Sequence, residues 1–189
     1  MAFQGKLVVI SAPSGAGKTS IAREILRLNP SLSFSVSATT RTKRTEETNG
    51  KDYFFLTKDE FLRRVEAGEF VEWETIYGNY YGTLKAEVDR ALKGGRHLLF
   101  DVDVKGGLSI KRQYPEALMV FIRPPSLEIL QQRLRDRNTE DVNTLARRLE
   151  RVPMELDLGN AFEHQVVNDK LPQAIAEVHR IVQKHLQES

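Results

Sequence analysis

Short apolar runs alternate with amphipathic stretches along most of this 189-residue chain. The first run, Lys6–Ser11 (KLVVIS), predicts a buried strand, and the apolar spacing of Lys18–Leu28 predicts a helix directly after it. Three further apolar runs predict strands, each followed by a helical stretch: His97–Asp103, Leu118–Pro124 and His164–Asp169. This alternation is typical of βα units that build a parallel sheet with helices on both faces, so we expect an α/β fold.

Two segments interrupt that rhythm. Between about residues 33 and 83, the runs SFSVS, DYFFLT and EFVEWE are strand-like, and a helix is expected only at about Asp59–Ala67. A small, mostly β insertion is therefore predicted there, of the kind that often carries specificity. Residues 127–159 are helical in pattern and dense in arginine. The remaining core, about 1–32, 84–126 and 160–189, belongs to the same single domain.

Composition excludes several classes of function. The chain has 28 lysine and arginine residues and 26 acidic residues, so its net charge is +2. It therefore lacks the strong basic excess that is typical of nucleic-acid-binding proteins. The chain has no cysteine, so disulfides, thiolate metal sites and a cysteine nucleophile are excluded, and its four histidines have no zinc-type spacing. The apolar run Leu7–Ile10 is too short for a secretory signal or a membrane span, so we expect a soluble, cytoplasmic protein.

The stretch Ile10–Ser20 (ISAPSGAGKTS) fits the phosphate-binding pattern G-x-x-x-x-G-K-[ST], except that Ala12 stands at the first glycine. Alanine is the smallest side chain after glycine, and the position precedes the part of the loop that wraps phosphates. Glycines in the loop let successive N–H groups point at an anion, and the helix that follows adds its positive end. The alternative is a glycine-rich turn with a surface lysine. We expect a triphosphate to be bound by Ala12, Pro13, Ser14, Gly15, Ala16, Gly17, Lys18 and Thr19.

Two residues of this loop have expected individual roles. Lys18 is expected to reach the β and γ phosphates, and the Thr19 hydroxyl to ligate Mg²⁺. Asp101 and Asp103, two residues apart in LLFDVD, are predicted to project from one face of a strand end, where ligands bind in open α/β sheets. One carboxylate, assigned to Asp101, is expected to hold Mg²⁺ through water, and the other to accept hydrogen bonds from a substrate. The alternative is a solvated strand end.

Taken together, the motifs SAPSGAGKT, SVSATTR, NGKDYFF, FVEWE, GNYYGT, DVDVKG, PPS and VVND resemble the guanylate kinase family over nearly the whole chain. The resemblance implies a three-layer P-loop fold in which the β insertion binds GMP and the arginine-rich segment is a lid. It implies transfer of the γ-phosphoryl group of ATP to GMP, and to dGMP as well, with Mg²⁺. The expected partners are these nucleotides, in a monomer or small homo-oligomer. The first loop position in this family is commonly Gly or Ala, which agrees with Ala12.

The resemblance also implies which residues bind the acceptor. Arg41 and Arg44 offer guanidinium forks to the phosphate dianion, because their donors match its oxygens. Glu72 fits the ring N–H and amino group of guanine, whereas adenine would leave the carboxylate facing a lone pair. Glu74 shares its face of the strand, and only the family pattern selects Glu72. The full implied set is Ser37, Arg41, Arg44, Tyr53, Glu72, Tyr81, Thr83, Asp101 and Asp103.

Arginines of the lid are expected to stabilise the transferring group. Arg133 and Arg137 are four residues apart and so share a helix face. The resemblance nominates Arg133, Arg137 and Arg148 for catalysis beside Lys18 and Arg41, with Arg147 as the adjacent alternative to Arg148. From spacing alone, a charged surface helix is the alternative. The resemblance further assigns Asn168 to the adenine of ATP, although the residue also fits a helix cap, and Trp73 is expected in the core.

Some positions depart from the family pattern. Lys43, Thr45 and Glu46 stand where the family usually has Pro and Pro-Gly around Arg44, so the loop loses stiffness. Lys105 replaces a usual Gln and predicts a salt bridge to Asp103, and Asn138 replaces a Gly in the lid. Two other functions fit parts of the pattern: a P-loop kinase for AMP, dTMP or a phosphorylated sugar, and a non-catalytic guanylate-kinase-like module that binds phosphorylated peptides.

Overall fold

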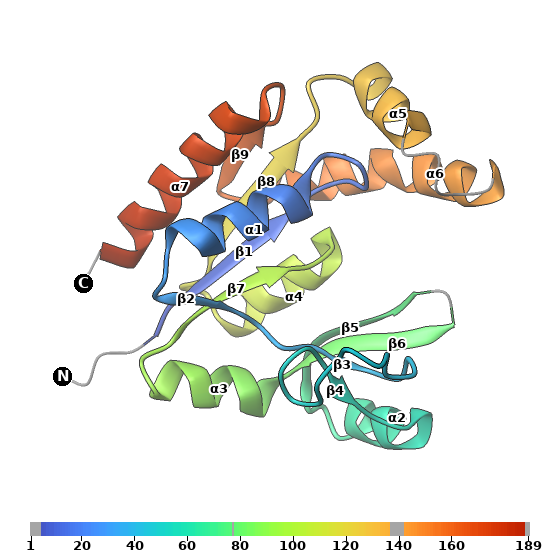
Figure 1. Ribbon diagram of the computed structural model, residues 1–189, viewed down its shortest axis with the longest axis vertical. Coiled ribbons are helices and arrows are strands. Elements are labelled where there is room, and N and C mark those ends of the chain that lie inside the picture. Colours follow the sequence, from blue (N-terminus) through green and yellow to red (C-terminus); the bar gives the residue numbers. More distant parts are fainter. Residues whose placement is uncertain (1–4, 77, 137–141, 188–189) are drawn as a thin grey trace.

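A five-stranded parallel sheet forms the centre of the protein, seen in a computed structural model that describes residues 5–76, 78–136 and 142–187 (Figure 1). Side chains of residues 136–148 lie outside the described part. The strands follow the order β2 (Leu32–Phe34), β7 (His97–Asp101), β1 (Leu7–Ser11), β8 (Leu118–Arg123) and β9 (His164–Val167). All their pairings are parallel, which confirms the predicted α/β class.

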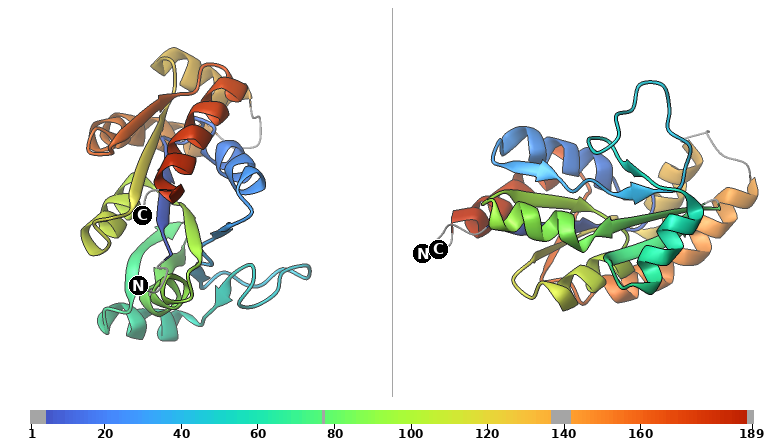
Figure 2. Two further views of the ribbon diagram at one scale, coloured as in Figure 1. Left: turned by 90° about the vertical axis from the view of Figure 1, so that its left-hand side faces the viewer. Right: turned by 90° about the horizontal axis from the view of Figure 1, so that it is seen from below.

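Helices cover both faces of this sheet (Figure 2). On one face pack α1 (Lys18–Leu28) and α7 (Leu171–Gln187), and on the other α3 (Lys85–Lys93) and α4 (Val104–Gln113). The four apolar residues of β1 therefore alternate between two cores: Val8 and Ile10 face α1, and Leu7 and Val9 face α4. Each such burial stabilises the fold by roughly 1.5–3 kcal/mol.

The β insertion has its own sheet, in the order β4 (Phe54–Phe55), β3 (Ala38–Thr39), β6 (Asn79–Leu84), β5 (Phe70–Ile76). Its helix α2 (Lys58–Glu66) places Phe61 in stacked contact with Phe70 and Tyr80, with ring centroids 4.3 and 5.4 Å apart. A small separate core thus supports the insertion.

The boundary of this insertion needs one correction. Ser33 and Phe34 belong to β2 and pair with β7 of the main sheet, so the insertion begins after Phe34. The run SFSVS contributes Ser33 and Phe34 to β2, and its last three residues form the link to β3 of the second sheet. The pattern also does not reveal β6, which pairs antiparallel with β5 and contains the glycine Gly82.

The arginine-rich segment forms α5 (Leu127–Asp136) and α6 (Val142–Gly159). Leu130, Leu134 and Val152 are buried in the same core as α1 and α7. The two ends of the segment are therefore packed on the main sheet. Among the described residues, no helix combines the length and apolar character that crossing a membrane requires.

Candidate active site

The phosphate-binding loop lies between the carboxyl end of β1 and the start of α1, as predicted. Gly15 and Gly17 have φ values of 88° and 95°, which favour glycine. A Cβ at Gly17 would lie 2.3 Å from Asn168 Nδ2, and one at Gly15 would lie 2.8 Å from Leu134 Cδ2. The loop is therefore pressed against β9 and α5. Ala12 is buried in the core at the end of β1, where a small side chain suffices.

Lys18 and Thr19 meet Asp101 at the end of the neighbouring strand β7. Lys18 Nζ lies 2.6 Å from Asp101 Oδ1 and donates to the Val102 carbonyl at 3.0 Å. The Thr19 hydroxyl donates to Asp101 Oδ2 at 3.2 Å. A hydroxyl and a carboxylate this close are hard oxygen donors of the type that Mg²⁺ prefers, so these residues fit the ion.

Asp103 does not lie on the strand with Asp101. Strand β7 ends at Asp101, and Asp103 instead caps α4, where its Oδ1 accepts from the Gly106 N–H at 2.7 Å. The expected salt bridge to Lys105 is also wrong: Oδ2 of Asp103 pairs with Arg151 Nη2 of α6 at 3.4 Å. Alternation along a strand stops applying once the chain turns into a helix.

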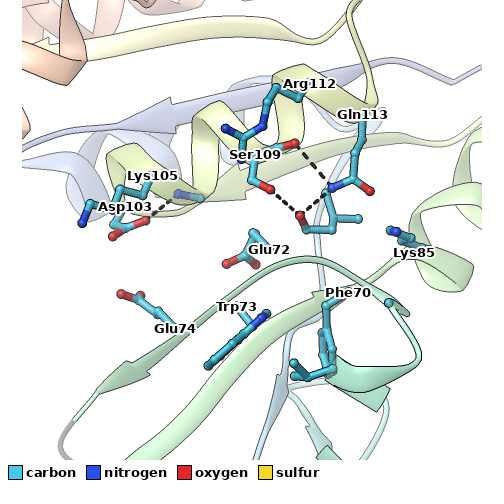
Figure 3. Close-up of a pocket in the computed structure, with 14 residues that line it drawn as sticks. Phe70, Glu72, Trp73, Glu74, Lys85, Asp103, Lys105, Ser109, Arg112 and Gln113 are labelled. Carbon is cyan, nitrogen blue, oxygen red and sulfur yellow. Dashed lines mark hydrogen bonds between the residues drawn. The ribbon is translucent and has the colours of Figure 1, made fainter. Parts of the chain in front are cut away.

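Glu72 extends from β5 toward the start of α4 (Figure 3). Its Oε1 accepts from the Thr83 hydroxyl at 2.6 Å across the β5–β6 pair. Burial raises the pKa of Glu72 to about 7; the Thr83 hydrogen bond acts against this shift, and the charges of Glu74 and Asp103 add to it. A cavity of about 470 Å³ lies between β5 and α4 beside these carboxylates.

Trp73 lines the same cavity and is 45% exposed, so its expected place in the core is wrong. It points away from the side of β5 that carries Glu72, and its ring meets only Tyr80 edge-on among the aromatic contacts of the described residues. The small size of the insertion explains the error, because the two faces of its sheet cannot both be covered.

A second cluster holds the residues expected to bind the acceptor phosphate. The guanidinium of Arg41 lies over the ring of Tyr53 at 5.4 Å, and Tyr53 packs edge-on against Tyr81 at 6.2 Å. Arg41 is held by Glu47, with Nη2–Oε1 and Nη1–Oε2 distances of 2.5 and 3.1 Å. This hydrogen-bonded pair raises the pKa of Arg41 and lowers the pKa of Glu47.

The backbone N–H of Arg44 donates to Glu47 Oε2 at 2.8 Å, which fixes the position of its main chain. Arg44 is exposed. Glu47 was not singled out in the sequence, because nothing distinguishes it there from the adjacent Glu46. A cavity of about 320 Å³ runs between this cluster and β7, and its lining includes Ser37, Tyr53, Thr83 and Asp101. These four residues of the implied acceptor set therefore share one cavity.

Asn168 is buried at the end of β9 and braces the phosphate loop. Its Nδ2 donates to the Ala16 carbonyl at 2.8 Å, and its Oδ1 has no hydrogen-bond partner in the described part of the chain. Helix α7 begins three residues later, at Leu171, so the alternative as a helix cap is wrong. Arg133 of α5 donates to the carbonyls of Asn168 and Asp169 at 3.0 and 3.4 Å.

The other lid arginines cannot be located as side chains. Arg137 lies outside the described residues, and Arg148 belongs to α6 with its side chain outside the described part. Asn138, a departure from the family pattern, is also outside. Two further residues of α6, Arg151 and Glu155, reach the site although the sequence analysis did not select them. Their spacing of four residues was the available signal, since it places both on one helix face.

Comparisons with known proteins agree on one family. A guanylate kinase family model matches residues 4–185. The chain is similar to the guanylate kinase of Salinibacter ruber, with 49% identity over 90% of this chain and 92% of that protein. It is 47% identical to the guanylate kinase of Chlorobium chlorochromatii, over 92% of each chain.

A solved structure supports the same relationship. The crystal structure of guanylate kinase from Anaplasma phagocytophilum superposes with a TM-score of 0.73 and 27% identity, over all of this chain and 90% of that one. A complete phosphate loop, a second site rich in charged side chains, and these similarities lead to one conclusion. The chain belongs to the guanylate kinase family.

Proposed function

We propose that this protein transfers the γ-phosphoryl group of ATP to GMP, giving ADP and GDP. The observation that carries the assignment of guanine is the largely buried Glu72 carboxylate, which accepts from Thr83 at the acceptor side of a complete phosphate loop. A buried carboxylate is costly unless donors satisfy it, and guanine offers two adjacent N–H donors. Ser37 and Thr83 would contact the remaining edge of the base.

The donor nucleotide would occupy the loop from Ala12 to Thr19. Main-chain N–H groups around Gly15 and Gly17 would bind the phosphates, and Lys18 would leave Asp101 for the β and γ oxygens. Mg²⁺, held by Thr19 and through water by Asp101, would neutralise charge on these oxygens. The free Oδ1 of Asn168 is suited to accept from the adenine amino group.

The acceptor phosphate would bind in the cluster of arginines and tyrosines. Its dianion would replace the Glu47 carboxylate on Arg41, because both present paired oxygens to the same guanidinium. Arg44, Tyr53 and Tyr81 would supply further donors. Asp101 and Asp103 would face the acceptor between its phosphate and its base.

Catalysis would come from positioning and charge stabilisation, with no covalent intermediate and no dedicated general base. Arg133, Arg137 and Arg148 would approach the transferring group when the lid closes. For Arg133 this requires release from the carbonyls of Asn168 and Asp169. The buried Leu130, Leu134 and Val152 would serve as the fixed base of such a movement.

We further propose that the protein acts in the cytoplasm, in purine nucleotide metabolism, as a monomer or small homo-oligomer without nucleic-acid or membrane partners. The net charge of only +2 supports the absence of a nucleic-acid partner. The activity is tested with MgATP and a panel of GMP, dGMP, AMP and dTMP in an assay for ADP formation. We expect turnover with GMP and dGMP. Preference for AMP or dTMP, or no turnover with any of them, would reject the proposal.

A further inference from the structure

Arg151 of α6 lies between carboxylates that belong to different walls of the site. Its Nη2 is 3.4 Å from Oδ2 of Asp103, the residue that caps α4 on the acceptor side. Its Nε is 3.7 Å from Oε1 of Glu155, one turn along α6. The Arg151 side chain is half exposed and therefore able to move, whereas both its partners are largely buried.

Glu155 fixes one end of this chain of contacts beside the phosphate loop. The residue is only 6% exposed, and its Oε2 has no hydrogen-bond partner in the described part of the chain. Burial raises the pKa of Glu155, while the charge of Arg151 and the backbone N–H of Ser14 in the loop lower it. A buried carboxylate with so few donors depends on its counter-ion, so Glu155 and Arg151 hold each other in place.

Asp103 fixes the other end beside the guanine-recognising residue. A Cβ on Gly106 would lie 3.1 Å from Asp103 Oδ1 and 3.3 Å from Glu72 Oε2, so both carboxylates crowd the same turn of α4. Arg151 thus links Asp103 to Glu155, the carboxyl whose pKa the Ser14 N–H of the phosphate loop lowers. Contiguous contacts of this kind can carry energetic coupling between two sites.

We infer that Arg151 is a positioning residue that couples the two nucleotide sites, making occupancy of the phosphate loop favour binding of GMP. Binding of a triphosphate reorganises the loop at Ser14, and Glu155 and Arg151 transmit this change to Asp103. The inference rests on the proposed function, because it assigns the acceptor site to GMP. Coupling between two ligands is a free energy, so it is measured as a ratio of affinities.

The test measures the affinity for GMP by isothermal titration calorimetry. GMP is titrated with and without a non-hydrolysable ATP analogue and Mg²⁺. The wild type should bind GMP at least fivefold more tightly with the analogue. Arg151→Met should reduce this ratio to about one and kcat about tenfold, with analogue affinity alone within twofold of wild type. Arg151→Lys should recover part of the ratio, because it keeps a charge.

Two further variants make the result specific. Arg90→Met, which removes an exposed arginine paired with Glu87 on α3, is the matched control and should retain the wild-type ratio. Glu155→Gln should lower the ratio as Arg151→Met does, and the double variant should lose no more than either single one. Thermal melting verifies that each variant is folded.

Unchanged coupling in Arg151→Met, additive losses in the double variant, or no coupling in the wild type would each overturn the inference. Turnover of GMP by the wild type is measured first. If that turnover is absent, the proposed function fails. If the wild type turns GMP over and Arg151→Met behaves like Arg90→Met, the inference alone fails.

Discussion

The phosphate loop and the acceptor insertion lie near the same edge of the main sheet but are held in place by different forces. The loop is shaped by backbone dihedrals at Gly15 and Gly17 and is pressed against buried Leu134 and Asn168. The insertion has a small core around Phe61 and presents charged side chains. Backbone geometry, close packing and the Lys18–Asp101 ion pair thus organise the donor side, whereas the cluster expected to bind the acceptor phosphate depends on the Arg41–Glu47 ion pair.

This difference predicts how each side responds to change. Main-chain donors do not titrate and hardly respond to salt, so donor binding should be insensitive to pH near neutrality. On the acceptor side, the pKa of Glu72 is raised to about 7 by burial, and Arg41 depends on an ion pair with Glu47. GMP binding should therefore depend on pH and on ionic strength.

The largest effect is expected for Lys18→Ala, which removes the one side-chain cation of the loop. We expect kcat to fall by about 10²- to 10³-fold, as for other removals of a group that stabilises developing charge. GMP binding measured by calorimetry should change little, because the acceptor site keeps its residues. Undiminished turnover would contradict the role of Lys18.

The next largest effect is expected for Glu72→Gln, which should weaken GMP binding on the acceptor side and leave binding on the donor side unchanged. The amide offers guanine one acceptor and one mismatched donor, so KM for GMP should rise about 10- to 100-fold. Affinity for the ATP analogue should stay within twofold. Glu74→Gln, two residues along the same strand face, is the matched control, and a larger effect there would show that the base is read by Glu74 instead.

An effect of intermediate size is expected for pH, which should change the affinity for GMP but not the affinity for the ATP analogue. With a pKa of about 7, Glu72 is mostly ionised at pH 8 and about one tenth ionised at pH 6. GMP needs the ionised form, so its affinity should fall about tenfold over this range, while that of the ATP analogue stays constant. Calorimetry in buffers of different ionisation enthalpy should detect proton release on GMP binding at pH 6. Proton uptake would contradict the assignment.

The same pKa fixes the sign of the effect on stability. Because the folded state keeps the Glu72 proton up to about pH 7 and the unfolded chain loses it near 4.5, the contribution of this group to stability falls as pH rises between these values.

The smallest effect is expected for Glu47→Gln. Loss of the Glu47 carboxylate frees Arg41 from its bidentate pair. The segment around Arg41 then loses order, but the carboxylate no longer competes with the GMP phosphate for Arg41. We expect a change in KM for GMP of about two- to fivefold, with kcat retained and weaker dependence on salt. Glu46→Gln, at the adjacent position, is the control and should leave KM unchanged. A loss as large as that of Glu72→Gln would mean that Glu47 itself binds the acceptor.

The layered fold and the phosphate loop could be predicted from the sequence alone. Both depend on local order along the chain: apolar runs fix buried strands, and the Gly15–Thr19 pattern fixes a loop between a strand and a helix. The motif resemblance also named four residues that line the acceptor cavity: Ser37, Tyr53, Thr83 and Asp101. These features need only neighbours in sequence, or a pattern already recorded in relatives.

Tertiary structure alone decided which charges meet. Arg151 and Asp103 are 48 residues apart, and their pairing follows from how α6 crosses the end of α4. Whether Asp103 pairs with Lys105 or Arg151, and whether Trp73 is covered, depends on the packing of distant elements. The physical reason is that a long charged or aromatic side chain has many local alternatives of similar energy, and only contacts across the fold select one.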